Sequence, residues 1–357
     1  MNWDIVISHN RKTARMPAEW EPHEATWLVW PHNYQDWPGK LASVRWVYVE
    51  IVRSLHKHEK VCIVVEDGKR EMAVRKQLDK SNIDLANIHF FSFSTDRSWV
   101  RDSGPTFFSS GTNLSAVCWY FNAWARYRNW QRDSSVSRKI ARSAGATICE
   151  PKHHRRRVVL EGGAIDVNGL GSLLTTERCL LGGKQSRNRS MTREDYEHLF
   201  CEQLNIQKVL WLSQGIAGDD TGGHIDGIAR FVDPRTVVIM VEANRNDVNY
   251  MPLKENLAIL KTLTDQDGQS IRVVELPMPR PLFFDGCRLP ASYANFYIAN
   301  GVVLMPTFND PNDRLALKTL EVLFPKREIC GIHAIDLAWG FGTIHCVTQQ
   351  QPSIRSV

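Results

Sequence analysis

Short runs of apolar residues alternate along the chain with amphipathic segments, and this rhythm predicts a mixed α/β fold. The apolar runs are rich in Val, Ile and Leu and are bounded by turn-forming residues, as is typical of buried strands. Strands are expected at 25–30, 61–65, 88–93, 114–120, 158–160, 165–168, 172–176, 208–212, 228–232, 236–242, 271–276, 295–299, 302–305 and 328–332. Asn168-Gly169 and Asn300-Gly301 supply the turns of two predicted hairpins.

Segments with helical periodicity lie between these strands. Helices are expected at 71–78, 134–144, 192–204, 253–263 and 312–324. Thr192 and Asp195 stand close to the pattern of a capping box at the start of one of them. No shift of composition suggests a linker, so the 357 residues are expected to form one domain, 1–357, of repeated strand-strand-helix-strand units.

The composition is that of an ordinary globular protein. Hydrophobic residues make up 43% of the chain, enough for a large core, and the net charge of +5 is too modest to point to a partner. The eight cysteines include no C-x-x-C pair, which favours reduced thiols over a disulfide framework. No window holds the roughly 20 apolar residues of a membrane span, and the apolar start is too short for a signal peptide. We expect a soluble, cytoplasmic protein with no membrane partner.

Cys346 is the first candidate for chemistry. It ends the glycine-rich run 340–346 and precedes the polar run 348–352. A lone cysteine is most often a small buried hydrophobe, but a buried strand would not be flanked in this way. A nucleophilic thiol must ionise, and a bound cation would lower its pKa as the site fills.

His224 and Asp226 form the second candidate. They are two residues apart and come just before the apolar run 228–232. In an extended segment both side chains would share one face, so that one ligand could touch both. Histidine suits proton transfer near neutral pH. A plain surface turn leading into a strand explains the same pattern equally well.

Asp102 and Glu161 each come just after apolar residues and one or two positions before a glycine. Either could be a turn former or the partner of a structural hydrogen bond. Glu161 comes directly after an apolar run, however, where a carboxylate needs a partner or a task. A thiol, an imidazole and three carboxylates together favour a cysteine hydrolase acting on a planar, cationic guanidinium group.

Two other interpretations were weighed. Asp219, Asp220, His224 and Asp226 could bind a metal, but their spacing suits neither a calcium nor a zinc site well, so no metal is expected. The basic run 152–157 could touch phosphate, but it lacks interleaved aromatic residues. A solvated loop is therefore favoured, and no nucleic-acid partner is expected.

Blocks of sequence also follow one another in a characteristic order along nearly the whole chain. They are MPAEWEPHE (16–24), TW (26–27), WP (30–31), WVRDSGP (99–105), LEGG (160–163), LTTE (174–177), ASY (291–293), NFYIANG (295–301), PTF (306–308), DPND (310–313) and IHCVTQQQP (344–352). Together they resemble the agmatine deiminase family, the branch of guanidino-modifying enzymes that also includes bacterial peptidylarginine deiminases. The resemblance implies a five-bladed α/β propeller (the pentein fold) of pseudo-repeated ββαβ modules.

The resemblance also implies roles for the candidate residues. Cys346 would be the nucleophile and His224 the general acid and then base, while Asp102 and Asp226 would clamp the guanidinium. Glu161 would pair with the substrate or with His224. The implied reaction converts agmatine to N-carbamoylputrescine and ammonia through a covalent thiouronium, without a cofactor.

The substrate tail is the least constrained part of this expectation. Trp99 and Asp220 fall where the family lines its pocket toward the tail. Gly222, Gly227 and Phe341 depart from the usual family pattern close to the expected pocket. A substrate bearing a carboxylate would need an arginine, and the arginines near these motifs in sequence are Arg101, Arg230 and Arg288.

Several alternatives therefore stay open. The substrate could be arginine, a peptidylarginine or a specialised guanidino metabolite in place of agmatine. A protein that binds guanidino ligands or nucleic acid without turnover is a further possibility, which retention of all the implied catalytic residues disfavours. Assembly into a homo-oligomer is possible.

Overall fold

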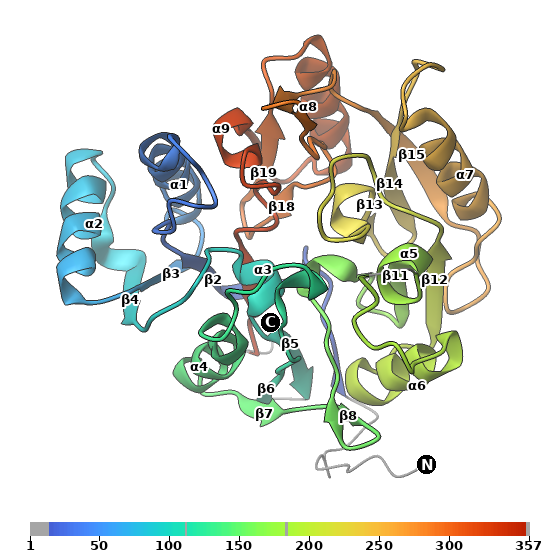
Figure 1. Ribbon diagram of the computed structural model, residues 1–357, viewed down its shortest axis with the longest axis horizontal. Helices are drawn as coiled ribbons and strands as arrows, with labels where there is room; N and C mark the ends of the chain where they lie inside the picture. The colour runs from blue at the N-terminus through green and yellow to red at the C-terminus, as the bar shows by residue number, and fades with distance from the viewer. Residues whose placement is uncertain (1–13, 111–112, 183–184, 355–357) are drawn as a thin grey trace.

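The computed structural model describes residues 14–110, 113–182 and 185–354, and its architecture is mixed α/β (Figure 1). Five sheets share one internal order, in which an antiparallel pair of strands is followed by a parallel strand. Their strands are β21 (Gln349–Pro352), β2 (His23–Val29), β3 (Lys60–Val65) and β4 (Ile88–Ser92); β1 (Ala14–Arg15), β5 (Thr106–Ser110), β6 (Asn113–Val117) and β7 (Thr147–Cys149); β10 (Asp166–Val167), β11 (Ser172–Thr176) and β12 (Lys208–Leu212); β13 (Ala229–Asp233), β14 (Thr236–Val241) and β15 (Arg272–Pro277); and β18 (Tyr297–Ile298), β19 (Val302–Thr307) and β20 (Glu328–His333).

Helices join the parallel strands within these sheets. Parallel neighbours need a crossover connection, and in each sheet a helix supplies it. The crossover helices are α1 (Leu41–Leu55), α4 (Val136–Ser143), α6 (Arg193–Leu204), α7 (Tyr250–Leu260) and α8 (Pro311–Leu323), and α2 (Gly68–Lys80) makes a second crossover to β4. In Figure 1 these helices lie toward the outside of the molecule. The strand-strand-helix-strand unit expected from the sequence is therefore present.

One sheet joins segments from the two ends of the described chain. β21 pairs antiparallel with β2, with Trp27 opposite Gln349. The Trp27 indole Nε1 donates a hydrogen bond of 2.9 Å to Gln351 Oε1, so a buried amide of this polar strand has a partner. The polar residues Gln349–Pro352 thus form a buried strand, and Cys346 lies in the turn before it, not in a strand. This pairing anchors the segment that carries Cys346.

Two local predictions were wrong, and one helix was missed. Residues 158–160 form no strand; Val159 makes only an isolated bridge to Tyr120. His224 and Asp226 do not lie in an extended segment, because residues Ile225–Gly227 form a 3-10 turn and the strand begins at Ala229. The long helix α1 was not predicted at all.

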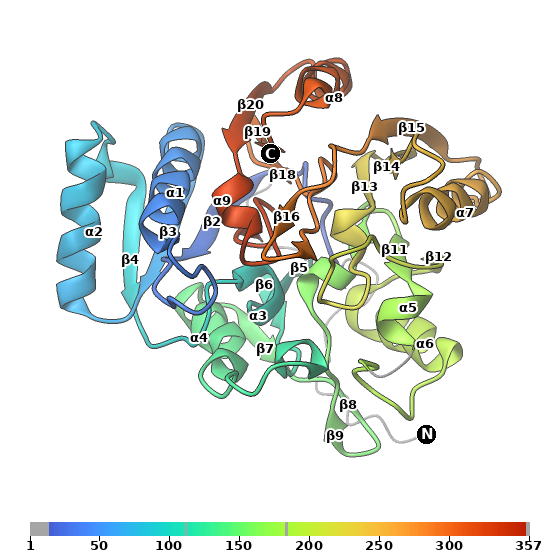
Figure 2. The same ribbon diagram turned by 45° about the horizontal axis from the view of Figure 1, so that its top comes forward.

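α9 (Ile335–Ala338), which precedes the Cys346 loop, contacts α1 and lies beside it in both views (Figures 1 and 2). The aromatic rings of Trp37 and Trp99 pack nearby, 5.1 Å apart, in the main hydrophobic core. A rigid, apolar base therefore supports the loop that carries the thiol.

Across the described ranges, no helix is both long and apolar enough to cross a membrane. All eight cysteines are unpaired, as the sequence predicted.

Candidate active site

Cys346 lies between α9 and β21, at the centre of a cluster of polar groups. Its Sγ is 3.3 Å from the amide nitrogen of Asn295 and 3.8 Å from Asp226 Oδ2. Its carbonyl oxygen accepts a hydrogen bond from the backbone N–H of Arg101, which joins the loop to α3 (Val100–Ser103). Burial raises the pKa of the thiol well above its usual value, and Asp226 and Asp102 raise it further. The cysteine is therefore a thiol until a cation enters.

Gly163 marks the point where three predicted site residues meet. A Cβ at this glycine would lie 2.6 Å from His224 Nδ1, 2.9 Å from Asp102 Oδ1 and 3.0 Å from Asp226 Oδ2. Its backbone N–H donates a hydrogen bond of 3.1 Å to Asp102 Oδ1. Short helical turns deliver these groups, so one imidazole nitrogen and two carboxylate oxygens converge on the Gly163 backbone, so closely that a Cβ there would have to displace them. Two carboxylates this close together favour a cation as their ligand.

Glu161 holds His224 from the opposite side of the ring. Its Oε2 is 3.4 Å from His224 Nε2, which leaves Nδ1 directed at the space beside Gly163. Burial would lower the pKa of His224, but Asp102, Cys179 and Glu161 together raise it well above its usual value. Burial likewise opposes ionisation of Glu161, yet Arg187 and His224 lower the pKa of this carboxyl to about 2. The pair is thus an imidazolium held by a carboxylate, as proton donation requires.

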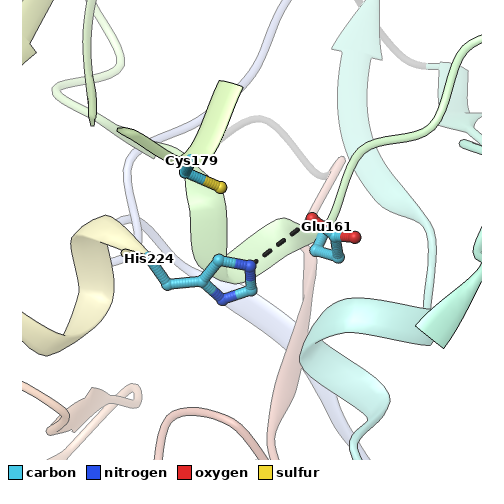
Figure 3. Close-up of side chains that lie close together, drawn as sticks. All are labelled: Glu161, Cys179 and His224. Carbon is cyan, nitrogen blue, oxygen red and sulfur yellow. Dashed lines mark hydrogen bonds and ion pairs between the residues drawn. The ribbon is translucent and has the colours of Figure 1, made fainter. Parts of the chain in front are cut away.

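Figure 3 shows a third side chain, Cys179, that points toward this pair from α5 (Glu177–Leu180). One ligand atom from each of Glu161, Cys179 and His224 lies within 4.8 Å of the others, a donor set that could suit zinc. However, Arg187 Nε donates to both oxygens of Glu161, at 3.0 and 3.2 Å. The Arg187 guanidinium therefore already binds the Glu161 oxygens that a metal ion would need as ligands, and these residues do not fit a metal ion well.

Asp102 is the more weakly acidic member of the clamp. Burial raises its pKa to about 6; His224 opposes this shift, whereas Asp226 adds to it. The Trp124 indole donates a hydrogen bond of 2.8 Å to Asp102 Oδ2 and fixes the orientation of the carboxylate. A cationic substrate would favour the ionised form of Asp102, and the ionised carboxylate would in turn bind that substrate more tightly.

Asp226 is ionised more readily than Asp102, because His345 is its partner. The His345 Nδ1 lies 2.8 Å from Asp226 Oδ2, and the other ring nitrogen lies 2.9 Å from Glu19 Oε2. Burial would raise the pKa of Asp226, but the hydrogen bond and charge of His345 lower it below its usual value. The residue next to Cys346 thus holds the Asp226 carboxylate in place.

Trp99 and Asp220 were predicted to line the pocket toward the substrate tail. Trp99 is buried, and its ring lies so close to the glycine-rich loop that a Cβ at Gly342 would come within 2.7 Å of it. Asp220 accepts a hydrogen bond of 2.5 Å from the Tyr127 hydroxyl, and burial raises its pKa to about 6. Asp220 is therefore held by an aromatic hydroxyl, and neither Trp99 nor Asp220 is among the residues that line the cavity beside Cys346.

Phe341, one of the departures noted in the sequence, has a φ of +67°, which few residues other than glycine adopt. It lines a small cavity together with Pro290, Asn295 and Cys346. This apolar ring therefore lies beside the thiol.

The structure also brings in residues that the sequence reasoning did not assign. They are Glu19, Arg187, Cys179, Asn295 and His345. Glu19, Asn295 and His345 stand inside the sequence blocks quoted above, so their place there was a usable signal. Arg187 lies outside these blocks, and only its contact with Glu161 reveals it.

Comparisons with known proteins agree with this geometry. Residues 15–352 match the family model described as Porphyromonas-type peptidyl-arginine deiminase. An agmatine deiminase from Ectopseudomonas mendocina is 35% identical, over 95% of this chain and 95% of its own length. A structure of the agmatine deiminase of Enterococcus faecalis superposes with a TM-score of 0.89 at 31% identity, covering 98% of this chain and 99% of that one. A substrate-bound Cys-to-Ser agmatine deiminase of C. jejuni has a TM-score of 0.83 at 29% identity, covering 95% of this chain and 96% of that one.

Proposed function

Because this chain belongs to the Porphyromonas-type peptidyl-arginine deiminase family, we propose that it hydrolyses agmatine to N-carbamoylputrescine and ammonia. The observation that carries the proposal is the convergence of His224, Asp102 and Asp226 on the space beside Gly163, with the thiol of Cys346 next to Asp226. A guanidinium offers N–H donors to both carboxylates and a planar, electrophilic carbon to the sulfur.

Binding activates the nucleophile. The incoming guanidinium offsets the negative field of the two carboxylates that raise the pKa of the Cys346 thiol, so the thiol loses its proton to solvent and the thiolate forms only with the substrate in place. The same two carboxylates orient the plane of the cation toward the sulfur. Asp102 and Asp226 thus serve both binding and activation.

The chemistry then proceeds in two halves. The Cys346 thiolate attacks the guanidinium carbon to give a tetrahedral adduct, and the His224 imidazolium donates its proton to the departing amino group, which leaves as ammonia. A thiouronium remains. The neutral His224 next takes a proton from water, and the resulting hydroxide adds to the same carbon. The C–S bond of this adduct then breaks while its hydroxyl proton passes to solvent, which releases the neutral ureido product and the thiolate. Glu161 steadies the charge on His224 throughout.

The contacts of the arginines favour agmatine over arginine as the substrate. The guanidinium of Arg230 binds Asp166 and Glu19, that of Arg101 binds Glu19 and Gln350, and that of Arg288 binds Asp247. Each of these three candidates is therefore already engaged and offers a poor partner for a substrate carboxylate.

Asp220 supports the same choice. It offers a negative charge beyond the clamp, which suits the ammonium end of agmatine. The carboxylate of free arginine would meet repulsion there.

Further parts of the proposal concern the whole chain. We propose that the five sheets close into a five-bladed α/β propeller and that residues 1–357 form one domain. The repeated sheet order and the β2–β21 pairing support this closure. We also propose that the enzyme is cytoplasmic and that it acts on a small cationic guanidino substrate without a cofactor. It binds neither nucleic acid nor membrane, and it assembles into a homo-oligomer.

The test is ammonia release from agmatine, arginine and a blocked arginine peptide in parallel, with Cys346→Ala as the control. We expect agmatine alone to be turned over, with formation of the ureido product and loss of activity in the control. Comparable turnover of arginine or of the peptide would show that the pocket accepts a substrate tail other than that of agmatine. Binding of all three without turnover would make the protein a binder.

A further inference from the structure

The side-chain amide of Asn295 lies beside the Cys346 sulfur with both of its ends within reach. Nδ2 is 3.3 Å from Sγ, and Oδ1 is 3.5 Å from the same atom. The two ends differ chemically, because Nδ2 only donates hydrogen bonds and Oδ1 only accepts them. The effect of the amide on the sulfur is therefore decided by its orientation and not by its position alone.

A nucleophilic thiolate needs the donor end of this amide. A negatively charged sulfur accepts hydrogen bonds, and an N–H directed at it favours the charged form, whereas a carbonyl oxygen disfavours it. Burial, Asp226 and Asp102 raise the pKa of the Cys346 thiol. The backbone of Thr343 and the Asn295 amide oppose that rise. Reversing the amide would remove one of these opposing groups.

The Thr343 hydroxyl holds the acceptor end of the amide. Thr343 Oγ1 donates a hydrogen bond of 2.7 Å to Asn295 Oδ1, and both side chains are buried. The backbone N–H of His345 also reaches Oδ1, at 3.1 Å, but it is shared with the backbone carbonyl oxygen of Asn295 at the same distance. The hydroxyl therefore makes the shorter and undivided hydrogen bond of the two.

The donor end of the amide faces two acceptors in this orientation. Besides the sulfur, Asn295 Nδ2 lies 3.5 Å from the backbone carbonyl oxygen of Asp226. In the reversed amide, Oδ1 would meet that carbonyl oxygen, and Nδ2 would meet the N–H of His345. Thr343 and Cys346 are three residues apart in one loop, so the residue that orients the amide moves together with the sulfur.

We propose that Thr343 is a positioning residue, whose hydroxyl fixes the Asn295 amide with its N–H directed at the Cys346 sulfur. The inference rests on the proposed function, since it concerns the thiolate that attacks the guanidinium. Thr343 acts on the sulfur through Asn295 in this scheme, and not through a contact with the substrate. Its hydroxyl should therefore influence the reactivity of the thiolate more than the binding of the substrate.

Alkylation of Cys346 measures the reactivity of the sulfur without any turnover. Thr343→Val removes the hydroxyl and nearly keeps the volume of the side chain. We expect it to slow alkylation by neutral iodoacetamide at a fixed pH about fivefold, roughly the effect of one hydrogen bond on an equilibrium. Thr343→Ser keeps the hydroxyl and should restore most of the rate. A wild-type rate in Thr343→Val, or a Thr343→Ser as slow as Thr343→Val, would overturn the proposal.

Thr348→Val is the matched control. Thr348 is also buried close to Cys346, but its hydroxyl donates to the backbone carbonyl oxygens of Ile344 and His345, at 3.0 and 3.1 Å. Losing this hydroxyl should leave the alkylation rate near that of the wild type. An equal slowing in Thr348→Val would show that any disturbance beside Cys346 has the same effect, which would also contradict the proposal.

A double-mutant cycle tests whether Thr343 acts through Asn295. Asn295→Ala alone should slow alkylation, and adding Thr343→Val should have no further effect, because the amide that the hydroxyl holds is gone. A further slowing as large as in the single variant would refute action through Asn295. Melting temperatures show which variants are folded. If Thr343→Val is not, Thr343→Ala, which removes the hydroxyl without adding a methyl group, takes its place.

Kinetics with agmatine separate this inference from the proposed function. If agmatine is the substrate, Thr343→Val should lower kcat about as much as it slows alkylation and leave KM nearly unchanged. A raised KM with an unchanged kcat would make Thr343 a substrate contact and overturn the positioning role. If the wild type does not turn over agmatine, the proposed function fails, while the alkylation rates and the cycle still decide the role of Thr343.

Discussion

Arg187 Nε donates to both carboxylate oxygens of Glu161, and neither side chain is exposed to solvent. The same carboxylate holds His224 Nε2. Removing one member of a buried ion pair leaves an uncompensated charge, which typically costs about 3–5 kcal/mol. This pair therefore links the stability of the chain to the orientation of His224, the proposed general acid.

The first prediction follows from that pair. Arg187→Met should lower the free energy of unfolding in urea by roughly 3 kcal/mol. It should also lower kcat, because Glu161 would then orient and stabilise His224 less well. Arg75→Met breaks the half-exposed pair between Arg75 and Glu71 and should cost at most about 1 kcal/mol. Equal losses of unfolding free energy in the two variants would show that the buried pair contributes no more to stability than the half-exposed one.

The second prediction concerns the space in which the guanidinium would lie. Gly163→Ala places a methyl group 2.6 Å from His224 Nδ1, so it should abolish agmatine turnover and weaken binding of unreactive guanidines. Gly68→Ala, at the start of α2, is the matched control, since a Cβ there meets nothing within 4 Å and the backbone is unstrained. Steady-state kinetics and the melting temperature of each variant provide the measurement. Retention of wild-type activity in folded Gly163→Ala would move the binding site elsewhere.

The third prediction concerns how the alkylation rate of the Cys346 thiol depends on pH. Because burial, Asp226 and Asp102 raise the pKa of Cys346, its alkylation by neutral iodoacetamide should still be rising with pH at about pH 9, above the usual thiol value. Asp226→Asn removes one negative charge and should speed this alkylation at a given pH, although it impairs turnover. Mass spectrometry of the Cys346 peptide follows the rate apart from the exposed Cys201 and Cys287. Slower alkylation in Asp226→Asn would refute the electrostatic account.

The fourth prediction concerns stability away from the site. Asp133 Oδ1 accepts from the backbone N–H groups of Asp96 and Arg97, its Oδ2 is buried without a partner, and burial raises its pKa to about 7. Between pH 4 and 7 the unfolded chain binds fewer protons at this residue than the folded one, so this carboxyl makes stability fall as pH rises. Asp133→Asn should therefore raise the unfolding free energy by roughly 1–3 kcal/mol at pH 8. At pH 4 the variant and the wild type should differ little.

Strands with continuous apolar sequence were predictable to within a residue or two. β3 and β11 are examples, since β-branched or apolar residues fill them and turn formers flank them. Helix α1 was missed because it carries many β-branched residues and no side chain caps it at Lys40. Its apolar face packs against other elements, and no local signal in the sequence announces that packing.

The candidate site was predictable where chemistry is concentrated in short motifs. The sequence identified Asp102, His224 and Asp226, and the structure brings them together. The contacts of His345 were out of reach, because its two carboxylate partners lie 119 and 326 residues away along the chain. Long-range hydrogen bonds of this kind depend on how the sheets are placed relative to one another, and no local pattern in a single sequence indicates that placement.

The pairing of β21 with β2 also has a consequence for biosynthesis. β2 is the second and β21 the last of the described strands along the chain, so during synthesis this sheet gains its final strand only after every other described strand has been made. Cys346 emerges just before β21, long after Asp102, Glu161 and His224. A nascent chain can therefore shape the pocket, but it lacks the sulfur. Interrupted translation products would be unable to consume substrate.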